Sequence, residues 1–142
     1  MSVLQDTFQA IEDRLTADMI FKNYFRQLET FSLTEVIDEP YFLLGAPGLE
    51  VEPHTISLGE VATFRIPIQF VIKNDDSQKT TYEYLKAIEI FLNAYYGSDC
   101  TFDGKINKTL FSFADPQEQE NNSIVGSGEI EIQLNIFSQG GL

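Results

Sequence analysis

The stretch Val61 to Asn93, VATFRIPIQFVIKNDDSQKTTYEYLKAIEIFLN, decides how this chain is expected to fold. The even positions from Ala62 to Ile72 are all apolar, whereas most of the odd positions between them are not. Because side chains alternate faces along a strand, this pattern predicts a long strand with one buried face and one wetter face.

A polar turn and a helix follow the predicted strand. Residues 73–78 carry Asx and Ser side chains that hydrogen-bond nearby backbone and favour a turn. Thr80 and Glu83 have the spacing of a capping box, and Gly97 can supply the left-handed residue that closes a helix. Between them an apolar stripe recurs at steps of three and four: Thr81, Tyr84, Leu85, Ile88, Phe91, Leu92 and Tyr95. We expect this helix to lie on the apolar face of the strand.

Shorter elements surround this unit. An amphipathic helix is predicted from the spacing of four apolar residues near the N-terminus: Leu4, Phe8, Ile11 and Leu15. Asp18 can cap a second helical turn, but the segment Met19 to Leu33 is also compatible with a partly extended chain. Alternation or apolar runs predict strands at three further places: residues 41–44, 105–113 and 129–136.

Three segments are expected to lie outside the core of the sheet. Residues 49–58 alternate loosely and contain Pro53, which suits a projecting arm at an edge. Residues 114–126 are predicted to form a mobile polar loop, and residues 138–142 a frayed tail. The whole chain, 1–142, is therefore predicted to be one α+β domain. We expect an antiparallel or mixed sheet of four to five strands with helices packed on one face.

The charge balance is strongly acidic. Nine Lys and Arg stand against 22 Asp and Glu, and no Lys or Arg lies between Arg26 and Arg65 or after Lys108. Such a surface repels phosphate backbones and anionic lipids, so we expect neither specific nucleic-acid binding nor membrane binding. Two interpretations remain open: the acids maintain solubility, or they form a surface that DNA passes without sticking.

Signals for targeting and for chemistry are absent from the sequence pattern. The N-terminus lacks a signal-peptide pattern and no apolar run could span a bilayer, so we expect synthesis in a cytoplasm. His54 and Cys100 are the only residues of their kinds, no cluster has metal-ligand spacing, and no phosphate-binding motif occurs. We therefore predict no catalytic residues, no cofactor and no metal, although an enzyme with an unrecognised site stays open as an alternative.

The order of the predicted elements resembles that of the tail terminator proteins of long-tailed, lambda-like bacteriophages. The resemblance covers about Leu4 to Phe137, and it is clearest over Asp38 to Leu44 and from Ala62 through Ser77 into the helix. The chain departs from the family's pattern at Met19 to Leu33, which is more apolar. The resemblance implies a non-enzymatic ring, usually a hexamer, that caps the tail tube, stops its polymerisation and docks to the head connector.

Such a ring implies roles for two sets of residues. The polar sheet face would line a channel through which DNA passes without specific binding, and the residues expected there are Thr63, Arg65, Gln69, Glu129, Glu131, Gln133 and Asn135. The arm would reach a neighbouring subunit, and the residues expected at that interface are Leu49, Val51, Glu52, His54 and Ile56. The implied partners are further copies of the chain, the tail tube protein and the head–tail connector protein, in the neck or tail of a virion. The alternatives are another phage neck, tail tube or completion protein, or an acidic chaperone or adaptor that binds one client.

Overall fold

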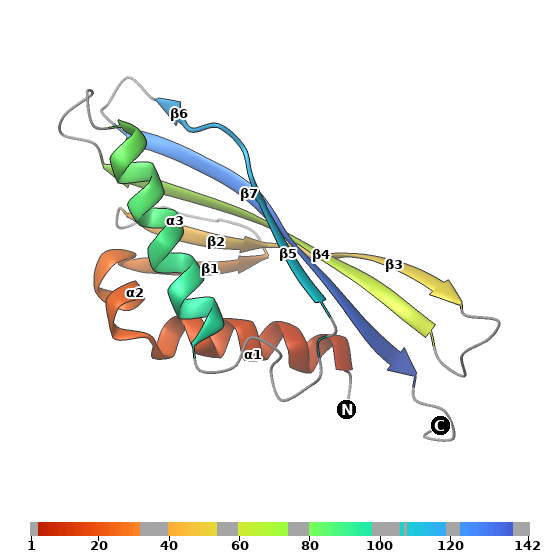
Figure 1. Cartoon of the computed structure of the whole chain (residues 1–142). Helices are drawn as coiled ribbons and strands as arrows, with labels where there is room; N and C mark the ends of the chain where they lie inside the picture. Colours follow the sequence, from red (N-terminus) through yellow and green to blue (C-terminus); the bar gives the residue numbers. More distant parts are fainter. Residues whose placement is uncertain are drawn as a thin grey trace.

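The computed structural model describes residues 3–31, 40–53, 60–73, 80–97, 106, 108–118 and 123–137. Within these ranges the chain forms three helices and seven strands (Figure 1). The helices are α1 (Val3–Ala17), α2 (Met19–Tyr24) and α3 (Thr80–Tyr96). The strands are β1 (Gln27–Phe31), β2 (Tyr41–Gly45), β3 (Gly48–Pro53), β4 (Glu60–Lys73), β5 (Lys108–Phe113), β6 (Gln117–Glu118) and β7 (Ser123–Phe137).

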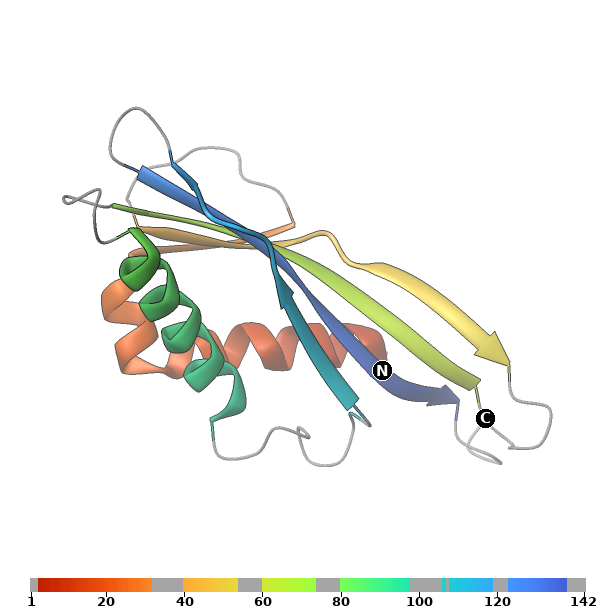
Figure 2. The same cartoon turned by 45° about the horizontal axis from the view of Figure 1, so that its top comes forward.

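The strands form one mixed sheet in the order β1-β2-β4-β7-β5, with β3 also paired to β4 and β6 to β7. The β1–β2 pair is parallel and every other pair is antiparallel. The three helices all lie on one side of this sheet (Figure 2). The predicted α+β class, with a sheet covered by helices on one face, is confirmed. The predicted count of four to five strands is wrong, because the short strands β1 and β6 and the arm strand β3 join the same sheet.

The long pair β4 and β7 is the centre of the sheet. Their register runs from Glu60 opposite Phe137 to Lys73 opposite Ser123. The even positions of β4 predicted to be apolar and inward-facing are all buried, from Ala62 to Ile72. Their partners Leu134, Ile132, Ile130 and Ile124 are fully buried as well, so the alternation read from the sequence is confirmed on both strands.

One edge of β4 is shared by two strands in succession. β2 pairs with β4 from Ile68 onward, and β3 pairs with it up to Arg65. Pro67 lies opposite the junction, where neither strand pairs with β4, and a proline is tolerated where a ladder is interrupted. Gly45 lies so close to Pro67 at this junction that a Cβ at position 45 would be only 2.8 Å from Pro67 Cγ.

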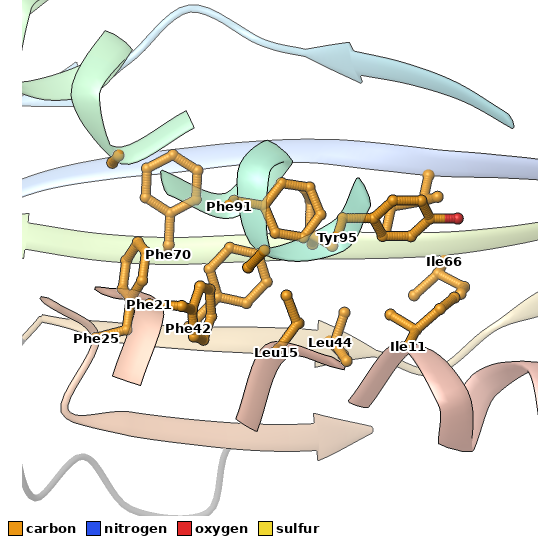
Figure 3. Packing of buried hydrophobic residues seen from close by; sticks show 14 of the residues in the cluster. Ile11, Leu15, Phe21, Phe25, Phe42, Leu44, Ile66, Phe70, Phe91 and Tyr95 are labelled. Carbon is orange, nitrogen blue, oxygen red and sulfur yellow. The ribbon is translucent and has the colours of Figure 1, made fainter. Parts of the chain in front are cut away.

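A layer of aromatic rings joins α3 to the sheet (Figure 3). The Phe91 ring of α3 stacks on Phe42 of β2, with centroids 4.9 Å apart and planes 20° from parallel. The Phe42 ring stacks in turn on Phe70 of β4 at 5.8 Å, and Phe70 stacks on Tyr84 of α3 at 5.6 Å. The three phenylalanines are fully buried, so this layer belongs to the interior of the core.

The buried stripe of α3 differs from the predicted one. Ala87 and Ala94 are buried together with Tyr84, Phe91 and Tyr95, whereas the Leu85 side chain is 55% exposed. The alanines let the helix backbone approach the sheet closely, which turns the buried stripe around the helix axis and leaves Leu85 outside. The predicted C-terminal closure is confirmed: Gly97 has φ +50° and donates its N–H to the Asn93 carbonyl.

The segment with mixed signals contains a helix and then a strand. The Asp18 side chain accepts a hydrogen bond of 2.9 Å from the Phe21 N–H and so caps α2, as predicted. α2 ends after six residues, and β1 begins at Gln27 beside β2. Phe31 at the end of β1 has φ 70° and stacks on Phe8 of α1 at 5.1 Å.

The prediction of a mobile polar loop over residues 114–126 is wrong in part. β6 pairs with β7 within it, through Gln117 opposite Val125 and Glu118 opposite Ile124, and β7 already begins at Ser123. Short polar strands carry little sequence signal, because their stability comes from the partner strand. The predicted tail 138–142 and the arm beyond Pro53 up to residue 58 lie outside the described residues.

The aromatic layer predicts a large loss of stability on truncation. Phe91→Ala should lower the free energy of unfolding by about 3–5 kcal/mol, because it removes a fully buried ring and leaves a cavity among other rings. The measurement is urea denaturation followed by circular dichroism. Leu85→Ala on the same helix is the matched control and should change stability by about 0.5 kcal/mol or less. Equal losses for the two variants would contradict the observed orientation of α3.

The glycine beneath the Phe70 ring gives a second prediction. A Cβ at Gly126 would lie 2.3 Å from Phe70 Cζ, and Phe70 is held between Phe42 and Tyr84. Gly126→Ala should therefore destabilise the protein by about 1–3 kcal/mol through overpacking. Gly48→Ala is the control, since no atom lies within 4 Å of the added carbon there. A Gly126→Ala protein as stable as the Gly48→Ala protein would mean that the ring is free to move.

Candidate assembly and channel surfaces

The polar residues expected to face a channel come together on the sheet face that points away from the helices. Thr63 lies opposite Gln133 and Arg65 opposite Glu131 in the β4–β7 ladder. Gln69 and Glu129 occupy the same alternating register, opposite Ser127 and Pro67. Asn135 shares this register opposite Val61, although its side chain lies outside the described part of the chain. The structure therefore brings polar residues from two strands that are distant in sequence onto one face of the sheet.

Arg65 is the centre of this polar face. Its guanidinium lies 2.9 Å from Glu50 Oε2, 3.1 Å from Glu131 Oε1 and 3.7 Å from Glu129 Oε1. The hydrogen bond that Arg65 donates to Glu50, together with the nearby carboxylates, raises the pKa of the guanidinium above its usual value. All four side chains are partly exposed, so these pairs orient the strands more than they stabilise the fold.

The face carries more charged groups than the sequence analysis identified. Glu50 joins it from β3, Glu29 from β1, Lys108 from β5 and Lys73 from the end of β4. Together with Arg65, Glu129 and Glu131 they make four carboxylates against three cations, so the described face is mixed rather than uniformly acidic. The alternation of residues 49–51 and 105–113 indicated that Glu50 and Lys108 face outward. The strand pairing was needed to place both on this face, with Glu50 beside Arg65.

The arm forms a second surface. β3 and the adjoining parts of β4 and β7 extend past the helices (Figure 2). Leu49 and Val51 point to the helix side of the sheet, yet their side chains are 48% and 39% exposed. Glu52 pairs with Val61 through its backbone, and its side chain lies outside the described residues, as do His54 and Ile56. Two of the five residues expected at an interface are thus exposed apolar side chains.

A groove lies next to the arm, and no sequence pattern indicated it. It has a volume of about 410 Å³ and an apolar floor, with Gln5, Gln9 and Glu12 of α1 along its rim. The floor is formed by residues from four separate parts of the chain: Leu4 and Phe8 of α1, Phe31, Pro47 and Phe64. Leu49 is the register partner of Phe64, so the groove continues into the exposed apolar face of the arm.

A third surface lies at α2. Met19 and Ile20 are 67% and 69% exposed, which is unusual for large apolar side chains next to one another. Lys22 and Arg26 are exposed beside them and form no ion pair with any residue that the structure describes. A small pocket of about 150 Å³ lies between α1 and α2, with Leu15, Phe21, Phe25 and Leu28 inside and these two basic residues among its lining.

Metal-binding groups do not gather in the part of the chain that the structure describes. No group of three or more His, Cys, Asp or Glu side chains there is arranged to hold a metal ion. His54 and Cys100 both lie outside the described ranges. Among the described helices none is long and apolar enough to cross a membrane.

Comparison with known proteins identifies a shared fold. No family model matches the sequence, and no curated protein matches it. A chain in the virion of a native gene transfer agent (GTA) particle has a similar structure, with a TM-score of 0.52 and 9% sequence identity. The match covers 88% of this chain and 91% of that chain. The similarity therefore extends over nearly the whole of both folds.

The charge cluster at Arg65 gives a prediction for the polar face. Arg65→Gln leaves Glu50, Glu129 and Glu131 facing one another, so the urea midpoint of unfolding should fall at low salt. Most of the loss should disappear near 1 M NaCl, where the Debye length is about 3 Å. Lys108→Gln is the control on the same face and should show a smaller loss, because no described carboxylate pairs with Lys108. A loss that does not depend on salt would contradict an electrostatic origin.

Proposed function

We propose that this protein is a structural component of a phage-like virion and acts as a tail terminator. In this role it forms a ring, which the resemblance implies is a hexamer, at the head-proximal end of the tail tube. The ring stops polymerisation of the tube and joins it to the head connector. The observation that carries the proposal is the shared fold with a virion chain over 88% and 91% of the two chains. The order of elements that resembles tail terminators supports the finer assignment.

The two-faced sheet suits a ring subunit. The helices cover one face, and the polar face with Arg65, Glu129 and Glu131 is left open (Figure 2). In the proposed ring this open face lines the channel, with Thr63, Gln69, Gln133 and Asn135 beside the charged residues. The arm, including Leu49, Val51, Glu52, His54 and Ile56, contacts a neighbouring copy. A closed ring requires such heterologous contacts, in which different surfaces of identical subunits meet.

The proposed lining lets DNA pass without a stable complex. Arg65, the cation at the centre of the face, is already engaged by three carboxylates. A phosphate could pair with this guanidinium only by displacing them. The other two cations of the described face, Lys73 and Lys108, are outnumbered by its four carboxylates, so binding to DNA would stay weak. The partners in this proposal are further copies of the chain, the tail tube protein and the connector protein. The protein requires no cofactor for this function, acts without catalysis, and resides in the virion after synthesis in the host cytoplasm.

Two other functions fit parts of the same evidence. A tail tube or completion protein would share the virion fold but would stack repeatedly instead of capping. An acidic chaperone or adaptor would fit the net charge of −13 but would form at most a dimer. The terminator is preferred because the resemblance in element order extends through the arm and the central strand.

Assembly state tests these functions against one another. Each copy carries a net charge of −13, and exposed charges repel over about 8 Å at physiological salt. The purified protein should therefore be monomeric at low salt and form closed rings near 1 M NaCl, as measured by sedimentation and electron microscopy. Sucrose at equal osmolality is the control and should not promote rings, because it does not screen charge.

The images decide between the alternatives. Closed rings with the polar sheet face toward the channel support the terminator. Tubes that grow without limit indicate a tube protein, and a dimer at every salt concentration indicates an adaptor. Rings lined by the helices would contradict the proposed channel.

A further inference from the structure

We propose that the arm end of one copy docks onto the α2 corner of the next copy, head to tail. The arm end is the surface formed by the groove residues Phe8, Phe31, Pro47 and Phe64, the exposed Leu49 and Val51, and the rim residue Glu12. The α2 corner is the surface formed by Met19, Ile20, Lys22 and Arg26. This inference rests on the proposed ring, and it names both surfaces of each contact.

The arm end is an apolar surface that the described part of the chain leaves uncovered. Phe31 is 57% exposed although it stacks on Phe8, and Leu49 and Val51 extend the same surface along β3. The groove has a volume of about 410 Å³, and the waters in it lie mostly over apolar atoms. Release of these waters would favour the docking of another apolar surface.

The α2 corner is a protruding surface that is apolar like the arm end. Met19 and Ile20 stand next to each other at the start of α2 and project from the molecule, while Phe21 turns into the core. Two adjacent large apolar side chains give the groove a compact occupant. An exposed pair of this kind marks an interaction surface more often than scattered apolar residues do.

The charges of the two surfaces are complementary. Glu12 is the charged residue on the lining of the groove, so the arm end carries negative charge. Lys22 and Arg26 border the α2 corner in a chain with only nine basic residues. A positive surface that meets a negative one selects the pairing and its orientation.

The positions of the two surfaces favour a ring over a dimer with one shared patch. The arm and α2 lie at opposite ends of the molecule in both views (Figures 1 and 2). Two different surfaces of one chain produce a head-to-tail contact, and such contacts generate closed rings when the rotation between subunits closes. A second copy of the chain is therefore the occupant that these observations favour.

A charge-exchange experiment tests the pairing. Lys22→Glu and Glu12→Lys should each raise the protein concentration needed for assembly by about tenfold or more, because each places like charges across the contact. An equimolar mixture of the two variants should assemble again at the wild-type concentration, since every contact then joins opposite charges. Sedimentation at the lowest salt concentration at which the wild-type protein assembles is the measurement, because charge effects are screened least there, and thermal unfolding of each variant alone checks that both are folded.

The matched control is an exchange outside the proposed contact. Lys108 lies on the polar sheet face, away from both surfaces of the contact. A mixture of the Lys108→Glu and Glu12→Lys variants should therefore assemble no better than the Lys108→Glu variant does alone. Recovery by the Lys22→Glu mixture alone supports the contact. No recovery, or recovery by both mixtures, would overturn it.

A cross-linking experiment separates this inference from the proposed function. In a background without Cys100, Ile20→Cys and Leu49→Cys chains are mixed and treated with a short bismaleimide, which traps even weak contacts. We expect a covalent heterodimer, and a chain carrying both cysteines should give a ladder of oligomers. Leu110→Cys is the matched control, because Leu110 is 52% exposed and Leu49 48% exposed, but Leu110 faces the other side of the sheet. Rings that form without the Ile20–Leu49 cross-link would overturn this contact and leave the terminator function standing, and the absence of both rings and cross-links would overturn both.

Discussion

The antiparallel pairing of β4 with β7 is the constraint on which the rest of the structure depends. Two long strands in one register force every second side chain to the same face, so Phe64 and Ile132 lie together on one side and Arg65 and Glu131 on the other. The apolar side must be covered, and the helices cover it. The polar side needs no cover and remains available. A chemical difference between the faces thus follows from strand geometry alone.

The aromatic layer determines how α3 packs on the apolar side of the sheet. Phe42 and Phe70 come from paired strands, and Phe91 descends on them from α3. Small residues make room for these rings: Gly126 lies beneath Phe70, and Ala87 is a point where α3 approaches the sheet closely. Large rings and small neighbours alternate, so the helix has one position in which the core is filled.

The length of the central strands also creates the surfaces proposed for assembly. β4 and β7 continue past the region that the helices cover, and β3 pairs with the extended part. Leu49 and Val51 therefore point toward the helix side without a helix above them. Met19 and Ile20 stay exposed at the other end, because the short α2 buries only Phe21. A fold with unfilled apolar surfaces at both ends is suited to repeated contact with copies of itself.

The sequence by itself determined the elements whose periodicity is long and regular. It determined the central strand from Ala62 to Ile72, the α3 helix closed by Gly97, the Asp18 cap and the polar face around Arg65. Local rules govern these features, because face alternation, helix periodicity and capping involve residues near one another in the chain. Only the tertiary structure decided the rotation of α3 that exposes Leu85, the addition of β6, the contact of Glu50 with Arg65, and the groove built around Phe31 and Phe64. Each of these depends on segments far apart in the sequence, and their packing against one another fixes positions that no local pattern encodes.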